Sequence, residues 1–74
     1  MAKYIIKNNL PQGVTDFSKS EWDNAKQAKW FFNYLETLLS DKYTTKVVFR
    51  TSPLRGTIQV EIDGFYYYVE LYKV

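Results

Sequence analysis

The dipeptide Asp63-Gly64 constrains the fold of this chain more than any other sequence feature. It separates two runs of β-branched and aromatic residues, 57–62 and 65–74, and this arrangement is the strongest short-range signal for a β-hairpin. Because side chains alternate between the two faces of a strand, a two-residue turn also predicts which side chains share the core face. The predicted cross-strand pairs on that face are Ile62 with Phe65, Val60 with Tyr67, Ile58 with Val69, and Gly56 with Leu71.

The same register places the remaining hairpin side chains on the opposite face. These are Tyr66, Tyr68, Glu70 and Tyr72 on one strand, and Thr57, Gln59 and Glu61 on the other. Aromatic patches on a protein surface are usually covered or used for binding. The hairpin therefore predicts one face for the core and one aromatic face that requires a partner or a covering segment.

Upstream of the hairpin, the pattern predicts a strand at 3–9, a loop at 8–16, a helix, and a strand at 44–51. Ser18-Lys-Ser-Glu21 has the form of a capping box, and Phe17 and Trp22 are spaced as a hydrophobic staple, so the helix is expected to begin at Ser18. It is expected to end at 40–42. Its predicted core stripe has residues three and four apart: Ala25, Ala28, Phe32, Leu35 and Leu39.

The order β-α-β-β-β predicts a single α+β domain over residues 1–74. Its expected architecture is a small antiparallel sheet, a C-terminal three-stranded meander, with the one helix packed on one face. The first strand is expected to join an edge of the meander, where a right-handed crossover to a parallel neighbour satisfies the handedness rule. Which edge it takes is left open. Gly56 is expected in the left-handed conformation, at the end of a tight connection over 52–56.

Composition argues against catalysis. The chain has no histidine and no cysteine, so the common nucleophile–base pairs, thiolate metal sites and disulfides are absent. The acidic residues lack calcium-loop spacing, and there is no glycine-rich phosphate loop. We therefore expect no enzyme activity, no cofactor and no metal. No segment approaches the roughly 20 apolar residues of a membrane span, and the N-terminus does not resemble a signal peptide. A cytoplasmic protein without a membrane partner is expected.

Recognition remains, and its candidate residues are mainly on the aromatic face of the sheet. Tyrosine and arginine are enriched at binding hot spots, and the segment between Asp41 and Glu61 contains only basic charges. The candidate partner-binding residues are Lys46, Arg50, Arg55, Glu61, Tyr66, Tyr68, Tyr72 and Trp30. Trp30 lies off the helical core stripe. Either the loop over 10–17 covers it, which is the favoured interpretation, or it is an exposed anchor.

Two kinds of partner fit this set. Single-stranded nucleic acid would stack bases on Tyr66 and Tyr68 while Lys46, Arg50 and Arg55 contact phosphates. Glu61 and Glu70 would repel that backbone, and the net charge is only +2. A protein partner tolerates mixed charges and is favoured. A homodimer through the tyrosine face or an edge strand is a third hypothesis.

A resemblance at the level of composition supports the protein partner. The chain has 74 residues, is rich in tyrosine and lysine, and lacks catalytic groups. In these respects it is similar to the small accessory proteins of phages and mobile elements. That likeness implies a protein that binds and blocks a host protein, and it assigns no role to any residue.

Overall fold

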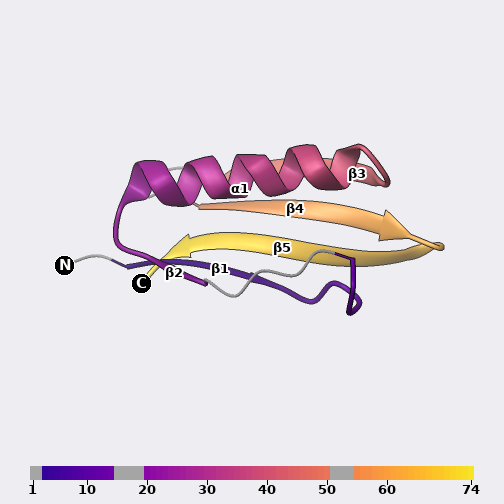
Figure 1. Ribbon diagram of the computed structural model, residues 1–74, viewed down its shortest axis with the longest axis horizontal. Helices are drawn as coiled ribbons and strands as arrows, with labels where there is room; N and C mark the ends of the chain where they lie inside the picture. Colours follow the sequence, from indigo (N-terminus) through magenta and orange to yellow (C-terminus); the bar gives the residue numbers. More distant parts are fainter. Residues whose placement is uncertain (1–2, 15–19, 51–54) are drawn as a thin grey trace.

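The computed structural model is an α+β fold in which one helix lies against one face of a five-stranded antiparallel sheet (Figure 1). It describes residues 3–14, 20–50 and 55–74, with the backbone alone at 49 and 50. The sheet order is β2-β1-β5-β4-β3, so the C-terminal meander has the predicted form. The elements in chain order are β1 (Tyr4–Asn8), β2 (Glu21–Trp22), α1 (Ala25–Ser40), β3 (Thr44–Arg50), β4 (Arg55–Ile62) and β5 (Phe65–Lys73).

The β4–β5 hairpin confirms the predicted register, since all four expected cross-strand pairs are present. Asp63 and Gly64 form the turn, with φ of 52° and 84° respectively. Two successive residues at positive φ are what a type I′ turn requires, and this turn matches the twist of the flanking strands. Gly56, expected in the left-handed conformation, is instead a residue of β4 that pairs with Leu71. Residues 52–54 of the predicted connection lie outside the described residues.

The core lies between α1 and the sheet, and both faces are those that the sequence pattern predicts. The fully buried side chains are Ile6, Ala28, Phe32, Leu35, Leu39, Ile58, Val60, Val69 and Leu71. Ala25 of the predicted stripe is only half-buried. Phe65, predicted to face the core, is 66% exposed. The hairpin turn extends past the end of α1 in Figure 1, so the helix does not cover this residue.

The helix begins later than the capping box predicts. Asn24 is the N-cap, and its Oδ1 accepts the backbone N–H groups of Lys26 at 2.8 Å and Gln27 at 3.1 Å. Glu21 belongs instead to β2, which pairs with β1, and the Ile6 N–H donates to the Ser20 carbonyl at 2.9 Å. These sheet hydrogen bonds override a capping motif whose first residue, Ser18, lies outside the described residues. The predicted end of the helix is confirmed.

Loss of the Asn24 cap should be measurable. Replacing Asn24 by alanine is expected to lower the free energy of unfolding by about 0.5–2 kcal/mol, because two helix N–H groups lose their acceptor. Urea unfolding followed by circular dichroism measures the change. Asn33→Ala, at an exposed position within the same helix, is the matched control and should not destabilise the protein. Equal unfolding midpoints for the two variants would show that Asn24 does not act as a cap.

Strand β1 joins the β5 edge and runs antiparallel to it, so the expected parallel pairing is wrong. The antiparallel direction results from β2, a strand that the sequence pattern does not predict. Each strand or helix here reverses the direction of the chain (Figure 1), and β2 adds one reversal between β1 and α1. Without this reversal, β1 and β5 would run in the same direction. Among the described residues, no helix has the length and apolar character needed to cross a membrane.

Candidate functional site

The face of the sheet opposite α1, here called the outer face, is a grid whose neighbours are set by strand register. Backbone pairing holds this grid in place, because β5 lies between β4, which pairs with Phe65–Leu71, and β1, which pairs with Val69–Lys73. The residues that pair across it are Ile5–Tyr72, Lys7–Glu70–Thr57–Val48, Tyr68–Gln59–Lys46 and Tyr66–Glu61–Thr44. The outer face is therefore a fixed arrangement on strands rather than on loops.

The structure brings most of the predicted binding residues together on this face. They are Lys46, Arg55, Glu61, Tyr66, Tyr68 and Tyr72. Arg50 pairs with Arg55 through the backbone, which places it at the same end of the sheet, and its side chain is outside the described part of the chain. Trp30 is the exception, because it belongs to α1 on the other side of the sheet.

The three tyrosines differ in how much of each ring solvent can reach. Tyr66 is 56% exposed and Tyr68 is 40% exposed. Tyr72 is half-buried, and the Lys7 Nζ atom lies 5.4 Å from its ring centroid, within the range of a cation–π contact. The exposed aromatic surface is therefore concentrated at Tyr66 and Tyr68, towards the hairpin turn.

Lys7 is a residue of the outer face that the sequence analysis missed. Its alternation with the buried Ile6 indicates that it points away from the core, but only the pairing of β1 with β5 shows that it lies beside Glu70 and Tyr72. No local signal in the sequence specifies that pairing. A nonlocal contact thus adds a cation to the predicted set.

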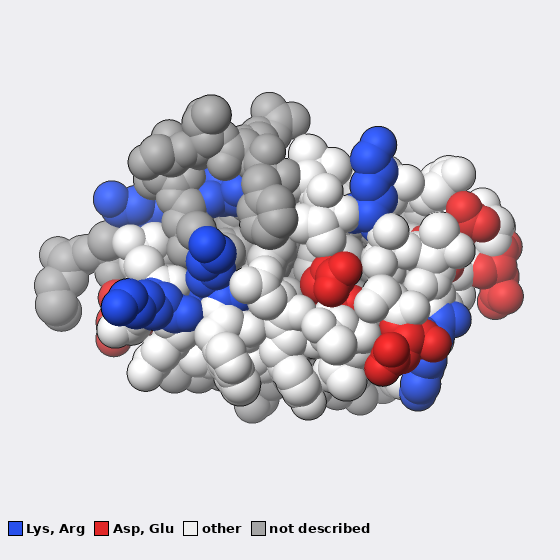
Figure 2. Space-filling view, turned by 90° about the horizontal axis from the view of Figure 1, so that it is seen from above, with Lys and Arg blue, Asp and Glu red and all other residues white. Residues whose placement is uncertain are grey.

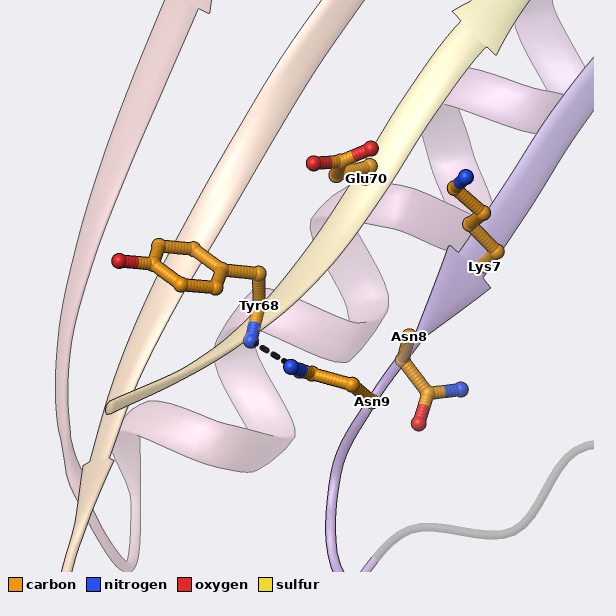
Figure 3. A pocket seen from close by; sticks show the side chains of 5 residues that line it. All are labelled: Lys7, Asn8, Asn9, Tyr68 and Glu70. Carbon is orange, nitrogen blue, oxygen red and sulfur yellow. Dashed lines mark hydrogen bonds between the residues drawn. The ribbon is translucent and has the colours of Figure 1, made fainter. Parts of the chain in front are cut away.

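A hollow of about 310 Å³ lies between β1 and β5 on this face. It is lined by Lys7, Asn8, Asn9, Tyr68 and Glu70 (Figure 3). Asn9 fixes its lower rim: its Oδ1 accepts the Tyr68 N–H at 2.7 Å, and its own N–H donates to the Tyr68 carbonyl at 3.2 Å. In Figure 3 the Tyr68 ring extends away from Asn9, over the neighbouring strand. The hollow leaves a lysine and a glutamate accessible beside an exposed aromatic ring.

Charges of both signs are interleaved on the outer face. Lys7, Lys46 and Arg55 are neighbours of Glu61 and Glu70 in the grid. At the β2 edge, the Lys3 Nζ and the Glu21 Oε1 form an ion pair at 3.5 Å. Within residues 3–14, 20–50 and 55–74, no group of three acidic, histidine or cysteine side chains could hold a metal ion. The described groups can supply aromatic contact, hydrogen bonds and mixed charge to a partner.

Trp30 is 64% exposed, so the favoured interpretation that the 10–17 loop covers it is wrong. Its ring stacks on Tyr34, with the centroids 5.7 Å apart and the planes 4° from parallel. Because α1 packs on the core face of the sheet, Trp30 and the outer-face tyrosines lie on opposite sides of the protein. The predicted set therefore divides into two separate surfaces.

The chain was compared with known proteins in three ways. A scan against protein-family models, a search of curated proteins and a search of solved structures each found no match. Function is therefore inferred from the geometry of the chain itself.

Proposed function

We propose that this protein is a non-catalytic module that binds another protein through its outer face and acts by occupying the partner's surface. The observation that carries the proposal is the pair of exposed tyrosines, Tyr66 and Tyr68, on the middle strand of a five-stranded sheet, near the hairpin turn. Tyrosine gives a large contact area at low cost in conformational entropy. Both tyrosines pair with β4 residues, and Asn9 also bonds the Tyr68 backbone, so little further ordering is needed on binding, which favours affinity.

The interleaved charges favour a protein over a nucleic acid as the partner. A phosphate backbone following Tyr66 and Tyr68 would pass Glu61, which pairs directly with Tyr66. A protein surface can instead match the acidic and basic groups one by one, which improves specificity. Lys7 is the one new observation that favours single-stranded nucleic acid, because it adds a cation beside the hollow at Tyr68.

The proposed setting is the cytoplasm, and the proposed effect on the partner is inhibition. The lack of cysteine fits a reducing compartment. The absence of histidine and cysteine supports a mechanism by steric occupation rather than by chemistry. A host protein blocked by a phage or mobile-element accessory protein is the partner class that the composition favours.

A double substitution tests the assigned face. Tyr66→Thr/Tyr68→Thr removes both exposed rings while threonine keeps a high strand propensity. Capture of a partner from lysate of the source organism, quantified by mass spectrometry, should fall by about 30-fold or more. The thermal unfolding midpoint should change little. Trp30→Ser, which removes an exposed ring from the opposite surface, should leave this capture intact. Full capture by the double variant would show that the outer face is not the binding site.

The salt dependence of binding distinguishes a nucleic-acid partner from a protein partner. Fluorescence anisotropy with a labelled single-stranded oligonucleotide, at low and at high salt, is expected to show no binding for a protein-specific module. Micromolar or tighter binding that weakens steeply with salt would instead support nucleic acid, because phosphate contacts release counterions. Lys7→Ala would then weaken it.

A further inference from the structure

The side of α1 that faces away from the sheet carries a row of exposed apolar residues that the proposed function does not use. Trp30, Tyr34 and Leu38 are spaced four residues apart and are 64%, 46% and 39% exposed. Residues at this spacing are neighbours on a helix surface, so they form one continuous strip, here called the helix row. Contiguous exposed apolar residues on a soluble domain are candidates for an interaction surface.

The helix row is held in place by aromatic contacts with the body of the protein. Trp30 stacks on Tyr34, and Tyr34 lies 6.2 Å from Phe31, measured between ring centroids. Phe31 in turn lies 5.1 Å from Trp22 of β2, on the same measure. The exposed rings are thus the outer end of a series of packed rings and present a preformed surface.

Opposite charges lie at the two ends of the helix row. Lys26 is one turn before Trp30, and Asp41 is the C-cap residue; both are exposed. In the part of the chain that the structure describes, neither has an ion-pair partner. Figure 2, which looks onto α1 from above, shows several basic groups towards the end where α1 begins, and it shows most acidic groups towards the other end, where basic groups also lie. The surface along the helix is therefore polarised.

The positions of Lys26 and Asp41 are unfavourable for a single helix, and Asp23 and Lys42, just outside its two ends, offset only part of this effect. The first turn of α1 contains no acidic residue and the last turn no basic one. Lysine near a helix N-terminus and aspartate near a C-terminus both oppose the helix dipole. The arrangement becomes favourable if a second helix packs antiparallel, because each charge then meets the opposite charge and the opposite dipole end.

We propose that a second copy of the chain packs antiparallel on the helix row, across a two-fold axis close to Tyr34. Trp30 of one copy and Leu38 of the other then lie at the same level, since each is four residues from Tyr34. Lys26 is eight residues before Tyr34 and Asp41 is seven after it. At 1.5 Å per residue, Lys26 of one copy and Asp41 of the other therefore differ in position along the helix axis by only about 2 Å. At about 100° per residue, Lys26 and Asp41 also fall on the same flank of the contact, and Lys42 falls on the other.

The size of the interface sets the expected strength. A helix of 16 residues is about 24 Å long, and one face of it provides less than the roughly 800 Å² per partner of a standard interface. The dimer is therefore weak and concentration-dependent. The outer faces remain open on the two far sides of the dimer, so each dimer offers two copies of that surface.

A charge exchange tests this interface. Sedimentation equilibrium over a concentration series should show a monomer–dimer equilibrium for the parent protein. Lys26→Glu or Asp41→Lys alone should weaken dimerisation roughly tenfold, because each places like charges at both symmetry-related contacts. The double variant, Lys26→Glu/Asp41→Lys, should return to within about twofold of the parent, since it restores the opposite pairing.

Each single charge variant should unfold at the same or a higher urea concentration than the parent, because the new charge complements the helix dipole. Weaker dimerisation of these variants would therefore not reflect misfolding. Two further variants complete the test. Trp30→Ser should abolish the dimer, and Tyr66→Thr/Tyr68→Thr should leave it unchanged, which keeps this interface distinct from the outer face. A parent that is monomeric at every concentration overturns the proposal. So does a dimer that survives Trp30→Ser, which would place the contact at the β3 edge or the outer face.

Discussion

Replacing Phe32 by alanine is expected to lower the free energy of unfolding by about 3–5 kcal/mol. The side chain is fully buried between α1 and the sheet and is among the largest in the core. A domain of 74 residues has a total stability of roughly 4–11 kcal/mol. The cavity left by the missing ring would therefore remove a large share of that stability, and the variant should unfold at a much lower urea concentration than the parent.

Phe65→Ala is the matched control, because it removes the same ring from a position that is 66% exposed. Its cost should be below about 1 kcal/mol, which is the range of strand propensity alone. Urea unfolding monitored by circular dichroism compares the two variants directly. If Phe32→Ala unfolded no earlier than Phe65→Ala, the helix would not be packed on the sheet as described.

The second large effect is expected at the hairpin turn. Gly64→Ala should lower the free energy of unfolding by about 1–2 kcal/mol, because residue 64 has a φ of 84° and a side chain is strained in that conformation. A Cβ atom at this position would have no heavy atom within 4 Å. The cost is therefore one of backbone conformation and not of a steric clash with neighbouring residues.

Asp63→Asn tests the same turn with a substitution that should not destabilise it. Asparagine tolerates the φ of 52° at this position, and Asn-Gly is a preferred pair for a type I′ turn. This variant should be as stable as the parent or slightly more stable. Thermal unfolding of both turn variants measures the contrast, and an unchanged midpoint for Gly64→Ala would contradict the assigned turn.

The fold was predictable where the determining interactions are local. The Asp63-Gly64 turn and the alternation around it specify the register of β4 and β5, and the spacing of Phe32, Leu35 and Leu39 specifies the buried side of α1. The start of the helix was not predictable in this way. The capping box ending at Glu21 is a good local motif, but hydrogen bonds to β1, distant in the chain, place Glu21 in a strand instead.

In the candidate site, too, the residues that local patterns specify were predictable and the others were not. Tyr66 and Tyr68 follow from alternation within the hairpin, and both are exposed on the outer face. The position of Lys7 depends on which strand β1 joins, and the exposure of Trp30 depends on what packs against the outer side of α1. Neither is encoded in a short pattern, so only the three-dimensional arrangement could place these two residues.

The two edges of the sheet have a consequence for growth by strand addition. One edge is β2, with two residues, and the other is β3, with seven. Because Ile62 and Phe65 flank a two-residue turn and exchange both hydrogen bonds, bonding alternates across the meander, and the N–H and C=O groups of Thr45, Val47 and Phe49 point outwards from β3. The β3 edge therefore offers an added strand more backbone groups than the β2 edge does. In an antiparallel strand added at this edge, the residues that hydrogen-bond to β3 would place their side chains on the face that α1 covers. The residues between them would place their side chains on the outer face.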